Sequence, residues 1–414
     1  MFKKVFAAML AGLFISAPAF AEVKMSGSFF IKGNANQSAS KKIDNYSYYE
    51  SDFEVKTDFI VDETTSAKLV VEAFDENWTS SSAANSDTIG VTTGVSQAAD
   101  KTVSTTSGTA VSGEAQNHLQ VTTATLTHKF ATGTSFTGGV SGNRDSWGTL
   151  FGDDADKNYF VQIDQALSFG TLVLKNEKIE ENELTDDNLD EDGYLLGLKT
   201  KAGGFDIMPA VYYRDNQKDD KTEARFMVAA TGKLGAFSIE SEFGYADFSD
   251  DKIDANEGSV FGAWVDAGTT VAGLSINAGI LYSGTDDAVV YNVGDELCPM
   301  EILGDDILID GASLVRVKVA KAITEKVGVD FSAAYTMTNL DDDYKTATVV
   351  DDDGDVSFKY AFDKAYEFDA NAFYKATDAV TLSCGIAYLD GDYADDSSFP
   401  QARIDSYAKI NVAF

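Results

Sequence analysis

Hydrophobic and polar residues alternate along most of this chain, with an apolar residue at every second position of many segments. The segments from Phe237 to Tyr245 and from Val327 to Tyr335 show the pattern clearly. A period of two is typical of a β-strand that presents one apolar face and one polar face. A tilted strand crosses a bilayer in about 9–11 residues, so segments of this length predict membrane-spanning strands.

Short turns and long polar connections separate these strands in a regular order. The short turns fall at 62–65, 131–134, 168–170, 202–204, 234–235, 271–273, 323–325 and 376–378. The long connections are 33–45, 75–117, 143–157, 180–192, 215–223, 247–257, 284–311, 338–364 and 390–401. This alternation is typical of a barrel with short periplasmic turns and long extracellular loops. The sequence therefore predicts an all-β, antiparallel transmembrane β-barrel of about 18 strands, with 16 as the alternative.

One residue disagrees with the strand pattern. Pro209 lies inside the strand predicted from Phe205 to Tyr213. Proline removes a ladder hydrogen bond, and a closed barrel has no sheet edge at which that loss is harmless. We expect a β-bulge at this position.

The first residues have the pattern of a secretory signal peptide. Two lysines, Lys3 and Lys4, precede an apolar run from Val5 to Ile15, and residues 19–21 read Ala-Phe-Ala. The small-x-small triplet is a signal peptidase site. A membrane anchor is the alternative, but the run is shorter than the roughly 20 residues of a spanning helix. We expect residues 1–21 to be removed and residues 22–414 to form one barrel domain.

The chain is strongly acidic, because 67 Asp and Glu residues oppose 32 Lys and Arg residues and give a formal net charge of −35. Binding of nucleic acid phosphates needs clustered basic side chains, so a nucleic-acid partner is excluded. Solubility or adaptation to salt is one interpretation of the acidity. Attraction of cations to the surface and lumen is the other, and composition alone does not choose between them.

The C-terminal strand, from Arg403 to Phe414, keeps its apolar residues in one phase and ends on an aromatic residue. This ending resembles that of Gram-negative outer-membrane porins. The leader, the immediate first strand and the hairpin order extend the resemblance to the whole chain. It implies a barrel of 16–18 strands among outer-membrane lipid and lipopolysaccharide. It also implies a homotrimer, and recognition of Phe414 by the barrel assembly machinery during biogenesis.

If the apolar phase faces lipid, the polar phase faces the lumen. This assignment puts a group of basic side chains on the lumen wall: Lys24, Lys56, Lys68, Arg316, Lys318, Arg403 and Lys409. Most of them lie on the first three strands and the last, which closure makes neighbours. Ordinary ion pairs with nearby lumen acids are the alternative to a selective basic wall.

The resemblance to general porins also implies an inward-folded loop whose acids face such a wall, so that charge selects among solutes. The segment 75–117 is the candidate. It carries the acids Asp75, Glu76, Asp87, Asp100 and Glu114. A loop that stays outside the barrel is the alternative.

A group of loop acids is the candidate for a structural Ca²⁺ site: Asp341, Asp343, Asp351, Asp353 and Asp355. With Gly354 at the sixth position of a calcium loop, the first and twelfth positions would be Val349 and Tyr360, which supply no carboxylate. A solvated acidic rim is therefore the alternative. No other cofactor is expected.

The sequence offers little for catalysis or for disulfides. His118 and His128 are the only histidines, and neither accompanies a recognisable nucleophile or acid motif, so we expect no enzyme activity. Cys298 and Cys384 are too few for a disulfide framework and are expected to be free thiols.

These features predict a porin that forms a water-filled channel for passive diffusion of small hydrophilic solutes and ions, with a preference for cations. Two alternatives remain: a barrel that only anchors structural or adhesive surface loops, and a channel specific for sugars or organic acids. A barrel of 16–18 strands encloses a channel, whereas a barrel of about eight is filled by its own side chains. The strand number favours a channel.

Overall fold

The structure of the protein is a computed structural model. It describes residues 22–38, 46–79, 120–141, 158–180, 190–217, 220–250, 258–286, 289–290, 298, 300–303, 311–339, 349–350, 356–357, 362–393 and 402–414. The predicted signal peptide lies outside the described residues.

Eighteen strands form one large sheet. Its first nine strands are β1 (Glu22–Ser38), β2 (Tyr46–Ile60), β3 (Thr65–Thr79), β4 (Gln120–Lys129), β5 (Thr134–Ser141), β6 (Asn158–Leu167), β7 (Gly170–Glu180), β8 (Glu191–Ala202) and β9 (Phe205–Asn216). The other nine are β10 (Lys221–Leu234), β11 (Phe237–Asp250), β12 (Gly258–Val271), β13 (Leu274–Ser283), β16 (Ala312–Ala322), β17 (Val327–Thr338), β20 (Phe362–Lys375), β21 (Val380–Tyr393) and β22 (Ala402–Ala413). Two small pairs accompany them: β14 (Thr285–Asp286) with β15 (Val289–Val290), and β18 (Val349–Val350) with β19 (Val356–Ser357).

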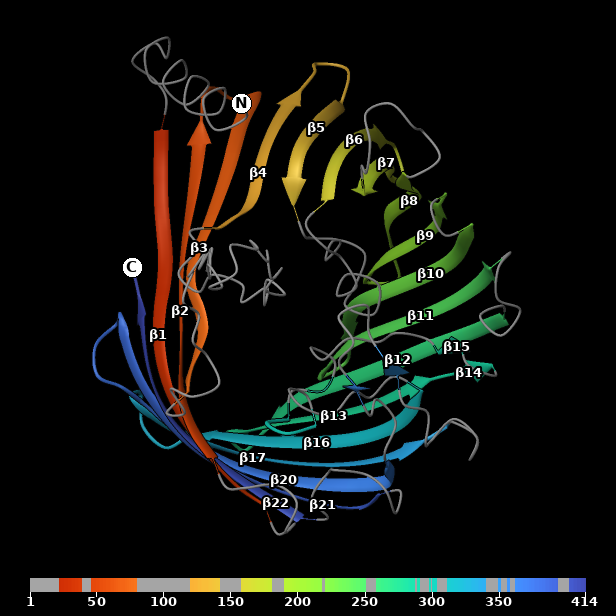
Figure 1. Ribbon diagram of the computed structural model, residues 1–414. Coiled ribbons are helices and arrows are strands. Elements are labelled where there is room, and N and C mark those ends of the chain that lie inside the picture. Colours follow the sequence, from red (N-terminus) through yellow and green to blue (C-terminus); the bar gives the residue numbers. More distant parts are fainter. Residues whose placement is uncertain are drawn as a thin grey trace, which may run out of the picture.

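The large sheet closes on itself. Its strands pair antiparallel in chain order, and β1 pairs with β22 from Ser28 opposite Ala413 to Ser38 opposite Arg403. Figure 1 shows this ring. Red β1 lies beside blue β22, and the green strands form the opposite side of the barrel. Closure leaves no unpaired strand edge, which is the condition for a β-structure to cross lipid. The predicted antiparallel barrel and its preferred number of 18 strands are confirmed.

The predicted short turns connect the strands as expected. In the β2–β3 turn, the Thr64 hydroxyl and the backbone N–H groups of Thr64 and Thr65 donate hydrogen bonds of 2.7 Å to the Asp62 carboxylate. These bonds hold the pKa of Asp62 below its ordinary value. In the β8–β9 turn, Gly203 and Gly204 have φ angles of 60° and 88°, in the left-handed region that glycine adopts most readily.

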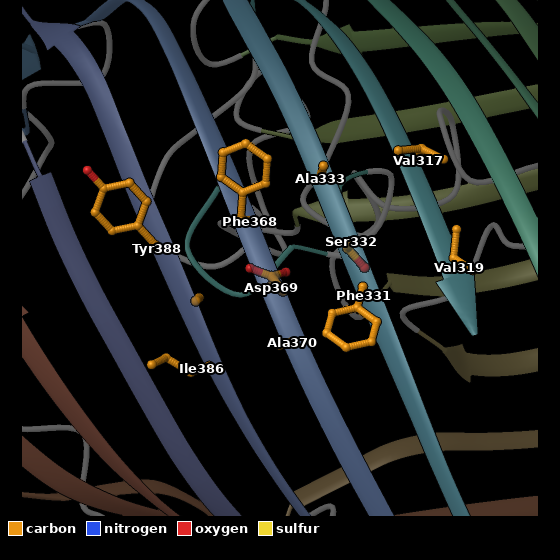
Figure 2. A pocket seen from close by; sticks show the side chains of 11 residues that line it. Val317, Val319, Phe331, Ser332, Ala333, Phe368, Asp369, Ala370, Ile386 and Tyr388 are labelled. Carbon is orange, nitrogen blue, oxygen red and sulfur yellow. The ribbon is translucent and has the colours of Figure 1, made fainter. Parts of the chain in front are cut away.

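The outer face of the barrel is apolar. Large exposed side chains such as Phe331 and Phe368 project from it on alternate positions. An apolar groove of about 410 Å³ lies on this face. Figure 2 shows the rings of Phe331, Phe368 and Tyr388 along adjacent strands of this groove. The small residues Ala333 and Ala370 lie between the rings. Such a surface suits the hydrocarbon interior of a membrane.

The inner face carries the polar phase. Arg225 is paired with Glu223, and Lys175 with Glu177, and all four side chains are buried inside the barrel. No helix among the described residues is long and apolar enough to cross a membrane. An even-numbered single-chain barrel with an apolar outside and a polar inside is typical of proteins that span the Gram-negative outer membrane.

The β-bulge expected at Pro209 is not present. Pro209 pairs with Val228 of β10 in unbroken register. On its other side, β8 and β9 keep one register from Gly197 opposite Ala210 to Thr200 opposite Ile207. The missing N–H of proline is therefore accommodated without an inserted residue.

Candidate functional site

The most distinctive feature of the lumen is a piece of the β15–β16 connection that lies against the inner wall. We call it the inner segment, defined as Cys298 together with residues 300–303. Four of its side chains, Cys298, Met300, Ile302 and Leu303, are at most 4% exposed. Burying one isoleucine or leucine side chain contributes about 1.5–3 kcal/mol, so this contact is substantial.

The wall under the inner segment is apolar, which is unusual for the inside of a pore. We call this surface the lumen patch. It consists of Ala246, Val260, Trp264, Leu281, Ala312, Leu314, Ala334, Ala365, Ala387 and Leu389, from strands β11 to β21. Trp264 is paired in register with Leu281, and Leu281 with Leu314, so these side chains form one continuous row on the same face.

A carboxylate anchors the inner segment to this patch. Glu367 of β20 accepts hydrogen bonds from two consecutive backbone N–H groups, that of Ile302 at 2.8 Å and that of Leu303 at 2.7 Å. Asp369, two residues further along β20, accepts a longer bond of 3.4 Å from the N–H of Glu301. A hydrogen bond to a charged group is worth about 1.5–3 kcal/mol. The polar anchor is thus comparable in strength with the apolar contact.

The inner segment also reaches the wall formed by β1 and β2. The ammonium of Lys32 lies 2.7 Å from a carboxylate oxygen of Glu301 and 3.7 Å from one of Glu50. Lys32 and Lys409 are register partners across the β1–β22 closure. The Lys409 ammonium lies 3.5 Å from the centre of the Phe30 ring. A loop acid therefore does face basic residues of the wall, and it comes from the β15–β16 connection.

Burial changes the acidity of two groups in the inner segment. Desolvation raises the pKa of Glu301 above its ordinary value, and the neighbouring Lys32 ammonium opposes that rise. Desolvation also raises the pKa of the Cys298 thiol to about 12, with the Glu367 carboxylate acting in the same direction. Cys298 is consequently an unreactive thiol while the segment stays in place.

The predicted basic wall has its members on one face of the sheet, with acids between them. Lys24 of β1 is the register partner of Asp58 of β2, and Asp58 is the partner of Lys68 of β3. Lys24 also lies 3.5 Å from Glu22, and Lys56 lies 2.8 Å from Glu54.

The remaining members of the predicted wall also have acidic neighbours. Arg403 donates to Asp405 at 2.8 Å, and Arg316 donates to Asp266 at 2.5 Å. The Lys318 ammonium lies 3.2 Å from Asp330. The lumen wall is therefore a mosaic of ion pairs, and its selectivity stays a prediction.

The acids of the predicted constriction loop are not brought together in the described residues. Asp75 and Glu76 belong to β3, which continues to Thr79. Asp87, Asp100 and Glu114 lie outside the described residues, so the role of segment 75–117 stays a prediction.

The sequence contains a sign of the inner segment in its departures from strict alternation. On β13 the inward residue Leu281 lies between the apolar outward residues Ile280 and Tyr282, and on β21 the inward residue Leu389 follows the apolar outward residue Tyr388. Such runs depart from strict alternation. In a barrel they indicate a stretch of inner wall that is covered instead of wet.

A second buried apolar group lies on the inner wall of β7 to β10. It contains Val173, Leu195, Ala210, Tyr212 and Met227. The hydroxyl of Tyr212 donates to Glu177 at 3.4 Å, which ties this group to the Lys175–Glu177 ion pair. The lumen wall therefore has two apolar regions, of which the larger lies under the inner segment.

The other predicted site residues have simple outcomes. The proposed calcium acids, Asp341, Asp343, Asp351, Asp353 and Asp355, lie outside the described residues, and no metal-binding cluster occurs within them. Cys298 and Cys384 are free thiols, as predicted. Phe414 exchanges backbone hydrogen bonds with Gly27 at 2.9 and 3.0 Å, and its ring stacks on Phe53. The terminal residue thus forms part of the closure of the barrel.

No known protein-family profile and no curated protein matches the sequence. Solved structures of outer-membrane porins do match the fold. OpdK of Pseudomonas aeruginosa, determined with vanillate, is 9% identical, and the match covers 94% of this chain and 98% of that chain with a TM-score of 0.54. OccAB3 of Acinetobacter baumannii is 10% identical, with 95% and 99% covered and a TM-score of 0.59. OccK2 (OpdF) of Pseudomonas aeruginosa is 7% identical, with 95% and 98% covered and a TM-score of 0.59. The likeness extends over the whole barrel and confirms the predicted porin fold.

Proposed function

We propose that this protein is an outer-membrane channel for passive diffusion of small hydrophilic solutes and ions, with a preference for cations. The observation that carries the proposal is a closed barrel of 18 strands with charged side chains on its inner wall. A barrel of this size has room for a water-filled passage, and solutes are then selected by the width of the passage and the charges that line it.

The preference for cations rests on the balance of charge. The basic groups of the predicted wall have carboxylates beside them, as in the Lys56–Glu54 and Arg316–Asp266 pairs. Because these pairs neutralise the bases locally, the net charge of −35 is left to act on permeating ions. The inner segment adds the Glu301 carboxylate at the narrowed side of the lumen.

A channel specific for organic acids or sugars is the second candidate. It is supported by the likeness to OpdK, a protein whose structure was determined with vanillate. In such a channel, Lys32 and Lys409 on the β1–β22 wall are candidate cationic groups to bind a carboxylate, with Lys32 exchanging its partner Glu301 or Glu50 for it.

Solute flux into liposomes separates these two candidates. Protein in liposomes is exposed to neutral sugars of increasing size, then to lysine and to gluconate as a cation and an anion of similar size. A diffusion channel admits the sugars in order of size and admits lysine faster than gluconate. Saturable uptake of vanillate or of one sugar would favour the specific channel, and absence of all uptake would favour a barrel that only anchors its loops.

The homotrimer implied by resemblance to general porins is a separate part of the proposal. A monomer is the alternative to a homotrimer. The mass of the detergent-extracted particle decides between one and three copies.

A further inference from the structure

The inner segment lies on the barrel wall without being a strand of the sheet. Its backbone N–H groups therefore need acceptors other than ladder carbonyls. Glu367 supplies two of them, since Oε1 accepts from Ile302 at 2.8 Å and Oε2 accepts from Leu303 at 2.7 Å. Each oxygen of the Glu367 carboxyl group accepts one of these bonds, so both oxygens are used to hold the segment.

The position of Glu367 is unusual for a lumen carboxylate. It lies on the inward face of β20, opposite Ala334 of β17 and Leu389 of β21, and its side chain is 0% exposed. These two neighbours belong to the apolar lumen patch. A carboxylate in such surroundings is costly unless hydrogen bonds satisfy it, and the two N–H groups of the inner segment do so.

The other attachments of the segment define its place less sharply. The bond from Glu301 to Asp369 is longer, at 3.4 Å, and the Lys32–Glu301 ion pair is partly exposed to solvent. Apolar contact between Ile302 or Leu303 and the lumen patch is non-directional and permits sliding. Within the described part of the chain, three backbone N–H groups of the inner segment donate to the wall, and the two shorter of these bonds go to Glu367.

We infer that Glu367 is a positioning residue that fixes the inner segment against the lumen patch and thereby sets the open width of the channel. The inference rests on the proposed channel function. When Glu367 loses its paired bonds to Ile302 and Leu303, the segment leaves the wall. The lumen widens on that side, and solvent reaches Cys298.

The chain contains its own reporter for this event. Cys298 is 1% exposed within the docked segment, and Cys384 is the only other cysteine in the sequence. Cys384 is exposed on β21. A Cys384→Ser background therefore leaves one thiol, whose reaction with a water-soluble maleimide reports whether the inner segment is docked.

The experiment compares Glu367, Glu367→Gln and Glu367→Ala in that background, using folded, detergent-extracted protein. Glutamine keeps one acceptor oxygen and puts an N–H₂ group where the second oxygen was, so it retains one bond and loses the other. We expect labelling of Cys298 to be about tenfold faster in Glu367→Gln, equivalent to about 1.4 kcal/mol of lost docking. Glu367→Ala should label faster still, and its single-channel conductance should exceed that of the parent.

A charge-loss control comes from the opposite wall. Asp164 of β6 accepts hydrogen bonds from Ser135 and Gln162, neither of which belongs to the inner segment, so Asp164→Asn should leave labelling unchanged. Folding of each variant is checked by the shift in gel mobility on heating that closed barrels show. Glu367→Gln keeps the test usable if Glu367→Ala does not fold.

The outcomes separate the inference from the proposed function. Folded Glu367 variants that label as slowly as the parent would overturn the role of Glu367. Rapid labelling of Cys298 in the parent would overturn the docked position itself. A parent protein that inserts into a bilayer without conducting overturns the channel function, and the labelling series still decides whether Glu367 holds the segment.

Discussion

The lumen patch on β11 to β21 is apolar and lies under the inner segment, whereas the wall at β22, β1 and β2 is charged and arranged in ion pairs. Both walls have the same strand geometry, so the difference lies in what each one faces. Apolar inward residues are stable where chain covers them, and paired charges are stable where water remains. If the barrel conducts as proposed, the passage is expected along the charged wall.

Placing a charge at the covered wall should have the largest effect. In Ile302→Asp, a carboxylate would be buried beside Glu367 in the apolar lumen patch, at a cost of several kcal/mol by any transfer scale. The inner segment should leave the wall while the barrel stays folded. The fluorescence of Trp264, measured with Trp78 and Trp147 replaced by phenylalanine, should shift to longer wavelength as water reaches the patch.

Ile302→Val is the matched control, because it removes one methylene and should cost only about 0.5–1.5 kcal/mol. An unshifted Trp264 spectrum in folded Ile302→Asp would contradict the covered wall.

Reversing a charge where the two walls meet should have the next largest effect. Lys32 lies between Glu301 of the inner segment and Glu50 of β2, and its side chain is 11% exposed. In Lys32→Glu three carboxylates gather at this place, and the ratio of potassium to chloride permeability should rise about tenfold, which corresponds to about 1.4 kcal/mol. The reversal potential across a salt gradient measures this permeability ratio. A ratio that falls or stays constant would show that ions pass elsewhere.

Reversing the charge of Lys56, on the charged wall, should have a smaller effect on cation preference. Lys56 is 46% exposed and pairs with Glu54 at 2.8 Å. Exposed pairs of this kind contribute about 0.2–1 kcal/mol, and salt screens them. Lys56→Glu should therefore raise cation preference by a smaller factor than Lys32→Glu, and the difference should shrink as ionic strength increases. Equal effects of the two substitutions would argue against a narrowing beside the inner segment.

Substitution of Asp62 in the β2–β3 turn should have the smallest effect, and it serves as a reference for both walls. Hydrogen bonds from Thr64 and Thr65 lower the pKa of Asp62, so its ionised form stabilises the folded state above the unfolded pKa of about 3.9. This contribution is lost as pH falls through the lower folded pKa. The melting temperature of Asp62→Asn should be slightly below that of the parent at pH 7, and the difference should vanish in strong acid. Conductance should not change, and a difference that grows in acid would contradict this assignment.

Much of the barrel could be predicted from the sequence because alternation is a local property. The turn around Asp62 and the strand from Val327 onward required only the period of two and the adjacent turn residues. Closure between Phe414 and Gly27 followed from an even strand number. The unbroken register at Pro209 did not follow, because it depends on two neighbouring strands together.

The site was harder to predict because it depends on contacts between distant residues. Glu367 and Ile302 are 65 positions apart, and the sequence around either residue does not predict its contact with the other. Segment 75–117 was the predicted constriction loop because it contains several acids. The segment that the structure places on the wall is mostly apolar. Departure from alternation at Leu281 and Leu389 is the sequence feature that points to it.

The central claim, an open channel with a preference for cations, is tested most directly by single-channel recording in a planar bilayer across a gradient of potassium chloride. We predict discrete conductance steps and a reversal potential of the sign set by potassium. Protein that inserts without conducting, or a reversal potential set by chloride, would contradict the claim.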